Sequence, residues 1–249
     1  MRTAAPRLPH RAWYYRLGKK ARRTIDRLIA RSSLIDTGPL LAEFPWMGEL
    51  SRRWRAIAAE ARALLPTVDE IPPLRLVSPD HGRISPDDQW RSFFLYGYGY
   101  KVEANCARCP ETTRLVETIP DLNSAFFSIL LPGTHIVPHR GPTKGLVTGH
   151  LGLKVPQSGR CLMRLDGRDV TWREGEWLVF DDTYRHEVWN DADEPRIVLL
   201  VQVRRPLRGL GKVAAQLFLS GIRRSPFVQE GRTNLAGWEK ALRAGDTPD

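Results

Sequence analysis

Cysteine is scarce in this sequence. Its 249 residues include only Cys106, Cys109 and Cys161, which are too few for a disulfide framework. The close pair Cys106 and Cys109 lacks the second pair that a structural zinc site of this kind requires. We therefore interpret the three cysteines as reduced thiols, which are typical of a cytoplasmic protein.

Long apolar runs are also absent. No stretch approaches the roughly 18 apolar residues of a transmembrane helix, and residues 1–12 have no apolar segment typical of a secretory signal. With 42% hydrophobic and 27% charged residues, the composition excludes a disordered chain and indicates an ordinary globular domain. The sequence therefore predicts a protein on the cytoplasmic side, with no membrane span.

Acidic residues are nearly absent from one segment and absent from another. Residues 1–35 carry ten Lys and Arg against the single acid Asp26, and residues 204–224 carry six bases and no acid. Residues 36–203 have a net charge of −4, so the formal net charge of +10 belongs to the flanks. The pattern predicts a mildly acidic body with two basic appendages.

Both basic appendages show helical periodicity. In residues 11–35 the apolar positions recur every three or four residues, as they do again in 210–221. We therefore expect a basic amphipathic helical segment at 1–35 and a basic amphipathic helix and tail at 207–249. In the first helix the predicted apolar stripe consists of Tyr14, Leu17, Ala21, Ile25 and Leu28.

The part between them, residues 36–206, begins with a predicted helix at 47–65 and a proline-rich irregular stretch at 67–89. From residue 90 the pattern changes to short strands separated by turn residues. Many short strands without intervening helices favour a mainly β fold such as a jelly roll, with flanking α-helices. The expected strands cover residues 92–98, 125–131, 150–155, 162–165, 170–172, 177–180, 186–189 and 197–203.

Histidines concentrate in and beside these strands. Four of the six, His135, His139, His150 and His186, lie there. Imidazole is a good ligand for iron, copper or zinc, and neighbouring strands of a small barrel bring two such residues to one metal. Spacing alone leaves a metal site and structural histidines equally open.

The acid of the common three-residue iron site is missing. That acid normally follows the first histidine by two positions, where this sequence has Gly141. Asp181 and Asp182 are candidates to replace it, but they lie in a predicted turn. We expect these two residues to brace the loop that carries His186.

Arg196 opens a strand and shares a face with Val198 and Leu200, so its side chain is predicted to point into an apolar interior. A buried guanidinium requires a carboxylate partner, which it binds through two parallel hydrogen bonds. Two interpretations stay open at this point: an internal salt bridge, or a site for the acid group of a small ligand.

Four ordered motifs resemble a known family. They are FSILLPGTH at 127–135, PHRGPT at 138–143, HLGL at 150–153 and FDDTYRHEVW at 180–189. Together they resemble the aspartyl/asparaginyl β-hydroxylases over residues 44–206. Members of that family are Fe(II)- and 2-oxoglutarate-dependent dioxygenases on a double-stranded β-helix, and they use two histidines with glycine in place of the acid.

The resemblance implies a role for each candidate residue. His139 and His186 would ligate Fe(II), and Arg196 would pair with the far carboxylate of 2-oxoglutarate, the cosubstrate used together with O2. Ser128 and His150 would assist at the cosubstrate. In addition, a tryptophan on the cosubstrate side of the family's site is matched by Trp90.

The family includes peptide Asp/Asn hydroxylases and bacterial enzymes that hydroxylate acyl chains of lipids such as lipid A or ornithine lipid. This sequence is more similar to the lipid branch, for example in DDQWRSFF at 87–94 and IRRSPF at 222–227. Where animal aspartyl hydroxylases carry arginines, it has Leu146, Val147 and Thr148. We therefore expect a lipid substrate, with a peptide or a free amino acid as the alternative. Halogenases also lack the acid ligand, but the resemblance favours hydroxylation.

The basic flanks suggest a partner. Basic amphipathic helices bind anionic membrane surfaces, with about 1 kcal/mol per Lys or Arg near the surface, although solvated charged faces over ordinary packing helices are an alternative. We expect peripheral attachment to the inner face of the cytoplasmic membrane, and we infer no obligate protein partner.

The first predicted strand and the residues just after it are rich in aromatic side chains. We expect them on one strand face, in the core or lining an acyl channel. A nucleic-acid module is the remaining alternative, but it needs bases interleaved with these aromatics, and only Arg91 and Lys101 qualify. The aromatic residues are Trp90, Phe94, Tyr96, Tyr98 and Tyr100.

Overall fold

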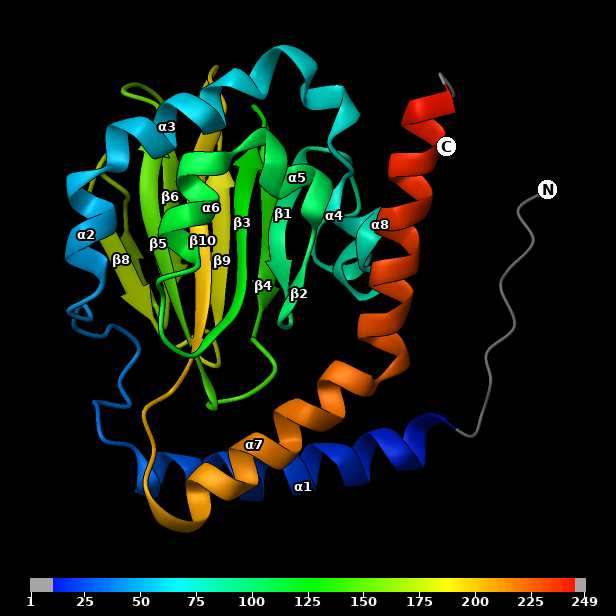
Figure 1. Ribbon diagram of the computed structural model, residues 1–249. Helices are drawn as coiled ribbons and strands as arrows, with labels where there is room; N and C mark the ends of the chain where they lie inside the picture. The colour runs from blue at the N-terminus through cyan, green and yellow to red at the C-terminus, as the bar shows by residue number, and fades with distance from the viewer. Residues whose placement is uncertain (1–10, 245–249) are drawn as a thin grey trace.

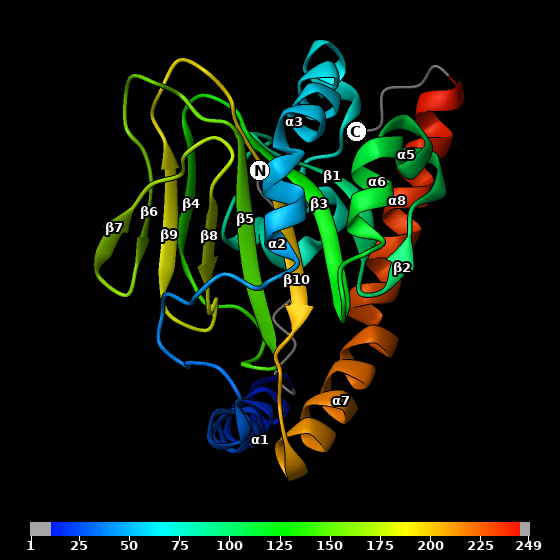
Figure 2. The same ribbon diagram turned by 60° about the vertical axis from the view of Figure 1, so that its left-hand side comes forward.

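The computed structural model describes residues 11–244, except for the side chains at positions 11–21, 79, 80 and 243. Within these residues, ten strands form two antiparallel sheets that face each other (Figures 1 and 2). The larger sheet has the order β2-β1-β3-β10-β5-β8, and the smaller has the order β4-β9-β6-β7. The strands are β1 (Trp90–Gly97), β2 (Tyr100–Lys101), β3 (Leu122–Leu130), β4 (Thr134–His139), β5 (Leu146–Lys154), β6 (Cys161–Leu165), β7 (Arg168–Val170), β8 (Trp177–Phe180), β9 (His186–Asn190) and β10 (Arg196–Arg204).

Helices cover one face of the larger sheet and one end of the molecule (Figure 1). The covering layer is formed by α2, α3, α5 and α6, whereas α1 and α7 lie side by side across the end and α8 continues along α4. The helices are α1 (Arg11–Ser32), α2 (Met47–Arg52), α3 (Trp54–Ala63), η1 (Leu65–Glu70), α4 (Leu74–Val77), η2 (Pro79–Arg83), α5 (Glu103–Arg108), α6 (Pro110–Val116), α7 (Gly209–Arg224) and α8 (Pro226–Ala244).

The central strands of the larger sheet are buried at nearly every position, because helices cover one of its faces and the smaller sheet faces the other (Figure 2). In β3, Phe127 and Ile129 pack under the helices, whereas Phe126 and Leu130 point into the space between the two sheets. Side chains alternate along a strand, so Ser128 must face that inner space. The two-residue period thus determines which polar side chains lie between the sheets.

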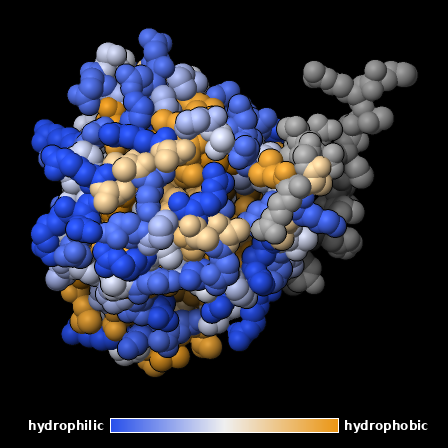
Figure 3. Space-filling view, turned by 45° about the horizontal axis from the view of Figure 1, so that its top comes forward, coloured by the Kyte–Doolittle hydropathy of each residue, from blue (hydrophilic) through white to orange (hydrophobic). Residues whose placement is uncertain are grey.

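This architecture confirms the expected mainly β, double-stranded β-helix fold with flanking α-helices. None of the described helices is long and apolar enough to cross a membrane. Hydrophilic residues dominate the face shown in Figure 3, where apolar residues occur in small separate groups.

Some elements differ from the expectations. The helix expected at 47–65 is interrupted at Arg53, whose φ and ψ of −100° and 7° are not helical. The strand β4 was not expected, because Pro138 lies within it. Residues 226–244, expected as a tail, form the helix α8.

The first helix also differs in detail. It ends at Ser32 rather than near Ile35. Among its described side chains, at 22–32, Ile29 is completely buried, whereas Leu28 is 36% exposed. Ile29 packs against Leu207 and Ala215, near α7. The side chains of the expected stripe residues Tyr14, Leu17 and Ala21 lie outside the described side chains.

The expectation that the aromatic residues of β1 share one face is wrong. The register of β1 against β3 shifts between Phe94 and Tyr96, and this bulge reverses the alternation of side chains. Trp90 and Phe94 therefore face the space between the sheets, but Tyr96 packs on the helix side and donates a hydrogen bond to Glu117.

Candidate active site

Two histidines meet where the smaller sheet ends. His139 is the last residue of β4 and pairs in register with His186, the first residue of β9, so their ring centroids are 4.1 Å apart. In each ring Nδ1 lies 2.9 Å from a backbone oxygen, that of Val137 for His139 and of Tyr184 for His186. A carbonyl oxygen only accepts, so Nδ1 carries the proton in both rings. The lone pair of each Nε2 is therefore available to a ligand.

Burial keeps both imidazoles neutral. It lowers the pKa of His139 to about 4, with a smaller contribution from the neighbouring His186, and it also lowers the pKa of His186. Neutral imidazole is the form that binds a metal, and a second hydrogen bond that fixes the ring strengthens such binding. The pair has the chemistry of a two-histidine metal site.

Gly141 occupies the position where an acidic ligand would stand, and the structure excludes a side chain there. A Cβ atom at Gly141 would lie 2.0 Å from Oδ1 of the buried Asp182. Asp182 Oδ2 accepts hydrogen bonds from Thr148 and Gln202, both at 3.2 Å, so the carboxyl group has little freedom to move. Glycine is thus required at 141 to make room for Asp182.

Asp182 itself is an unusual carboxyl group. Its Oδ1 has no hydrogen-bond partner among the described atoms, and burial together with the adjacent Asp181 raises its pKa to about 7. No group of three metal-ligating side chains occurs in the described part of the chain. Among the described residues, Asp182 and the two histidines thus do not form a three-residue metal-ligand group.

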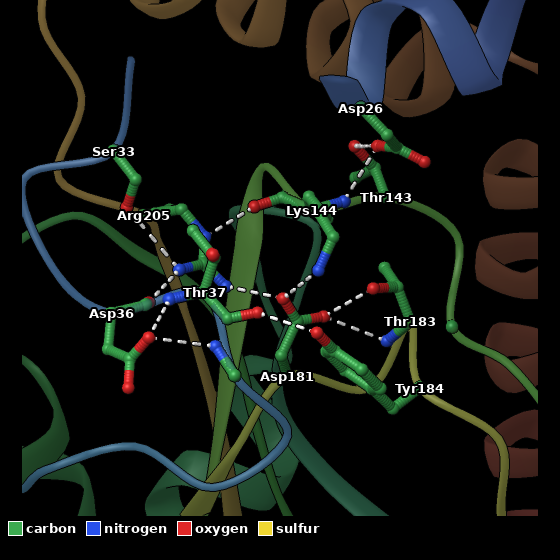
Figure 4. Close-up of polar contacts among 12 residues, drawn as sticks. Asp26, Ser33, Asp36, Thr37, Thr143, Lys144, Asp181, Thr183, Tyr184 and Arg205 are labelled. Atoms are coloured by element: carbon green, nitrogen blue, oxygen red, sulfur yellow. Dashed lines mark hydrogen bonds and ion pairs between the residues drawn. The ribbon is translucent and has the colours of Figure 1, made fainter. Parts of the chain in front are cut away.

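Asp181 braces the loop before His186, as expected (Figure 4). Its fully buried carboxylate accepts hydrogen bonds from Lys144 and Arg205, each at 2.7 Å, and from the backbone of Thr183 at 3.0 Å. Arg205 also donates to the backbone oxygens of Lys144 and Asp36. This cluster joins the loop of His186 to the loop that follows His139.

Helix α1 contacts the same loops. Arg22 donates a hydrogen bond of 2.6 Å to the backbone oxygen of Gly141, two residues after His139. Asp26 accepts from the backbone of Lys144 at 2.8 Å and from the hydroxyl of Thr143 at 3.1 Å. The basic segment at the N-terminal side is thus packed on the loop beside the histidines rather than separate from the body.

Arg196 is buried between the sheets, as the strand pattern predicts, with 1% of its surface exposed. Its guanidinium lies 4.6 Å over the ring of Trp172 and donates one long bond, 3.4 Å, to the backbone oxygen of Ser128. The Nε atom has no hydrogen-bond partner, and no carboxylate among the described residues pairs with this arginine. The internal salt bridge considered above is therefore not found in the described chain.

Burial lowers the pKa of Arg196 to about 10, so the side chain stays charged at neutral pH. A buried cation without an anionic partner costs several kcal/mol, on the order of the penalty for any unpaired buried ion. The guanidinium of Arg196 therefore has hydrogen-bond donors available for an anionic ligand.

His150 and Trp172 form a further pair beside Arg196. Nδ1 of His150 accepts a hydrogen bond of 3.2 Å from the indole of Trp172, so Nε2 carries the ring proton. That Nε2–H is buried and has no partner, and burial holds the pKa of His150 well below its usual value. The ring of Phe180 lies between the rings of His150 and His186, at 5.0 and 5.8 Å.

Trp90 and Ser128 complete the set. The indole of Trp90 donates a hydrogen bond of 3.1 Å to the hydroxyl oxygen of Ser128. All six residues named from the sequence therefore lie around the space between the two sheets. Four come from the larger sheet and two from the smaller: Trp90, Ser128, His150 and Arg196, then His139 and His186.

The sequence did not single out Trp172 or the role of Asp182. Trp172 contacts both His150 and Arg196, which are 22 and 24 residues away, so no local spacing reveals it. For Asp182 a signal existed, because it stands next to Asp181 in the motif at 180–189 and is acidic, whereas Gly141 in the motif at 138–143 replaces the usual acid.

The donor set fits a divalent metal with an anionic cosubstrate. The two free Nε2 atoms suit the metal, and the unpaired Arg196 together with the Nε2–H of His150 suits carboxylate oxygens. A carboxylate bound there would be buried, because Arg196, His150 and the aromatic Trp172 are themselves buried.

Comparisons with known proteins agree on one family. The model of the aspartyl/asparaginyl β-hydroxylases matches residues 51–206. The ornithine lipid ester-linked acyl 2-hydroxylase of Rhizobium tropici is 40% identical over 204 residues, which are 82% of this chain and 73% of that protein. The human aspartyl/asparaginyl β-hydroxylase is 36% identical over 162 residues, which are 63% of this chain but only 21% of that protein.

Among solved structures, a Pseudomonas putida prolyl-4-hydroxylase aligns with a TM-score of 0.40 and 22% identity, covering 64% of this chain and 88% of that one. The family match spans both histidine loops and the strand of Arg196. The chain belongs to the aspartyl/asparaginyl β-hydroxylase family.

Proposed function

We propose that this protein is an Fe(II)- and 2-oxoglutarate-dependent dioxygenase that hydroxylates an unactivated C–H bond in the acyl chain of a membrane lipid. The observation that carries the proposal is that the space between the sheets holds a pair of neutral histidines and a buried arginine that has no anionic partner among the described residues. The lipid substrate is supported by the 40% identity with an ornithine lipid acyl hydroxylase.

In this proposal His139 and His186 hold Fe(II) through their Nε2 atoms, and Arg196 binds the far carboxylate of 2-oxoglutarate. Ser128 Oγ accepts a hydrogen bond from the indole N–H of Trp90, so the Ser128 hydroxyl hydrogen is free to point to a cosubstrate carboxylate. His150 offers its unpartnered Nε2–H in the same region. When bound, iron, 2-oxoglutarate and O2 supply the oxidising chemistry, and the protein supplies placement and a dry pocket.

Asp182 and Gly141 act as positioning residues. Because Asp182 fills the space beside Gly141, no acidic side chain reaches the metal from that position. The fixed loops of Asp181 and Lys144 keep the two histidine rings at their present separation.

A peptide substrate is the second candidate, since the human relative is named for aspartyl and asparaginyl residues. The residues of this chain favour the lipid. Leu146 and Val147 are buried, and the hydroxyl of Thr148 donates to Asp182, so none of the three presents a cation to an acidic peptide side chain. The exposed basic residues of α1 and α7 are consistent with action at an anionic membrane on its cytoplasmic side.

The proposal is tested with purified protein, Fe(II), 2-oxoglutarate and extracted lipids. We expect release of succinate, and we expect His139→Ala and His186→Ala to lose both bound iron and succinate release. His135→Ala is the matched control, because His135 lies on the same strand β4 but has a partly exposed side chain near Glu187. Unchanged iron content and turnover in the two site variants would refute the assignment.

A further inference from the structure

An apolar groove runs between α1 and α7. Its volume is about 630 Å³, and it is a widely open surface depression rather than an enclosed cavity. Only one polar side chain, Ser225, contributes to the described lining. The described lining residues are Ile25 of α1 and Ala214, Leu217, Phe218, Gly221, Ile222 and Ser225.

The surface beside this groove is also apolar. Leu210, Val213 and Leu217 follow one another at helical spacing on α7 and are 76%, 52% and 70% exposed. The remaining large hydrophobic residues that are exposed in the described chain, Leu28, Leu34 and Leu40, lie in or after α1. The face in Figure 3, by contrast, is largely hydrophilic. Such a concentration of apolar surface indicates a binding surface.

The charges around the groove select an anionic surface. Residues 204–224 contain no acid, and on α1 the exposed side chains include Arg23, Arg27 and Arg31. The acid of α1, Asp26, is turned toward Thr143 and the backbone of Lys144. An apolar face with surrounding cations fits the interface of an anionic bilayer.

A series of aromatic contacts begins next to one end of the groove. Ser225 lines the groove, and two residues later Phe227 contacts the rings of Tyr98 and His81, each at 6.2 Å between centroids. The ring centroids of His81 and Trp90 are in turn 5.8 Å apart, and the indole of Trp90 donates a hydrogen bond to Ser128. Aromatic rings thus connect the groove to the cosubstrate side.

The other wall of the groove belongs to α1, which contacts the loop after His139. Ile25 lines the groove, and Arg22, one turn earlier on α1, donates to the backbone of Gly141, two residues after His139. The two walls of the groove are thus linked to the site through packed residues: α1 through Arg22 and Gly141, and the start of α8 through Phe227 and His81.

We propose that the groove between α1 and α7 binds an acyl chain of the lipid substrate at the membrane surface, on the side of the molecule where α1 contacts the loop after His139. This inference rests on the proposed function for the identity of its ligand. It assigns to the two basic segments a direct role in substrate binding, beyond attachment to the membrane.

Two glycines allow a matched test. Gly221 lines the groove, whereas Gly237 lies on α8 outside it, and a Cβ atom at either position would meet no atom within 4 Å. Leucine at either place fits the fold and is a better helix former than glycine. Gly221→Leu fills part of the groove, and Gly237→Leu adds the same bulk elsewhere.

The probe is a dansyl-labelled fatty acid, whose fluorescence reports binding to the full-length protein. We expect Gly221→Leu to weaken binding at least about tenfold, because even one extra methylene in an apolar site has an effect of that size. We expect Gly237→Leu to bind the probe like the unmodified protein. Equal affinity in all three proteins, equal weakening in both variants, or no binding to the unmodified protein would overturn the inference.

Turnover separates this inference from the proposed function. If Gly221→Leu loses only long-chain lipids while shorter chains are still hydroxylated, both stand. If the probe discriminates between the variants but no lipid gains oxygen, the groove stands and the hydroxylase proposal fails. If lipids are hydroxylated equally by all three proteins, the groove assignment fails alone.

Discussion

Hydrogen bonds at Nδ1 determine what His139 and His186 offer to a ligand. Each ring is held by a backbone oxygen only two residues earlier, so the strand ends themselves orient both Nε2 atoms. Arg196 is different, because its position is fixed by packing against Trp172 and its charge is left without a protein partner. Stability and function therefore make opposite demands on Arg196.

Arg196→Met tests this conflict. Replacing an unpaired buried cation by an apolar side chain of similar length should stabilise the protein without ligands, by about 1 kcal/mol or more. The same change should abolish the stabilisation that 2-oxoglutarate gives to the unmodified protein. Thermal unfolding with and without 2-oxoglutarate measures both effects, and a variant that is still stabilised by the cosubstrate would contradict the role of Arg196.

Gly141→Ala tests the close approach of Asp182. The added Cβ would lie 2.0 Å from Asp182 Oδ1, so the buried carboxyl group must move and lose its bonds to Thr148 and Gln202. We expect a loss of about 1–3 kcal/mol in the free energy of unfolding, measured with urea. Asp182→Ala in the same chain should relieve most of the additional clash. A Gly141→Ala protein as stable as the original would show that this contact is not constrained.

At the scale of elements, the loops that carry the two histidines are joined by the cluster around Asp181. The cluster connects residues far apart in the sequence, since Lys144 and Arg205 come from separate strands' ends and Asp36 from the segment after α1. Two cations, Lys144 and Arg205, pair with the buried carboxylate of Asp181. We infer that the cluster holds the two loops in register.

Arg205→Met should therefore destabilise the protein strongly. It removes one of two cations from a fully buried carboxylate, which typically costs about 3–5 kcal/mol. Arg164→Met is the matched control, because its pair with Asp169 is exposed and should contribute at most about 1 kcal/mol. Urea unfolding of both variants gives the comparison. Equal midpoints would mean that the buried pair contributes no more than the exposed one.

Much of the fold could be predicted because its signals are local. Alternating apolar residues marked most strands of the larger sheet, and the two histidine motifs stand in or beside strands. The strand β4 was missed because Pro138 interrupts its pattern, and the bulge after Phe94 reverses a face that simple alternation predicts. The contact between Arg22 and Gly141 spans 119 residues, and no local pattern indicates it.

At the scale of the whole molecule, the two basic flanks include α1 and α7, which pack against each other. The sequence places the positive excess in the two flanks, and the structure packs α1 against α7 at one end of the sheets (Figures 1 and 2). The exposed apolar residues of α7 lie at the same end. Charge and apolar surface thus favour one orientation of the protein on a membrane.

This arrangement predicts selective membrane binding. The protein should sediment with vesicles that contain phosphatidylglycerol but not with pure phosphatidylcholine, and added salt should weaken the association. Leu210→Gln combined with Leu217→Gln should reduce binding at least about tenfold, because each buried leucine contributes roughly 1.5–3 kcal/mol. Binding that depends neither on lipid charge nor on these leucines would exclude this surface as the attachment site.

The central claim, hydroxylation of a lipid acyl chain, is tested most directly by mass spectrometry of membrane lipids incubated with the protein, Fe(II), 2-oxoglutarate and isotopically labelled O2. We predict that a lipid gains one labelled oxygen atom on its acyl chain as succinate is released, and that His186→Ala produces neither change. Unaltered lipids, with the labelled oxygen found instead on Asp or Asn of an added peptide, would contradict the account.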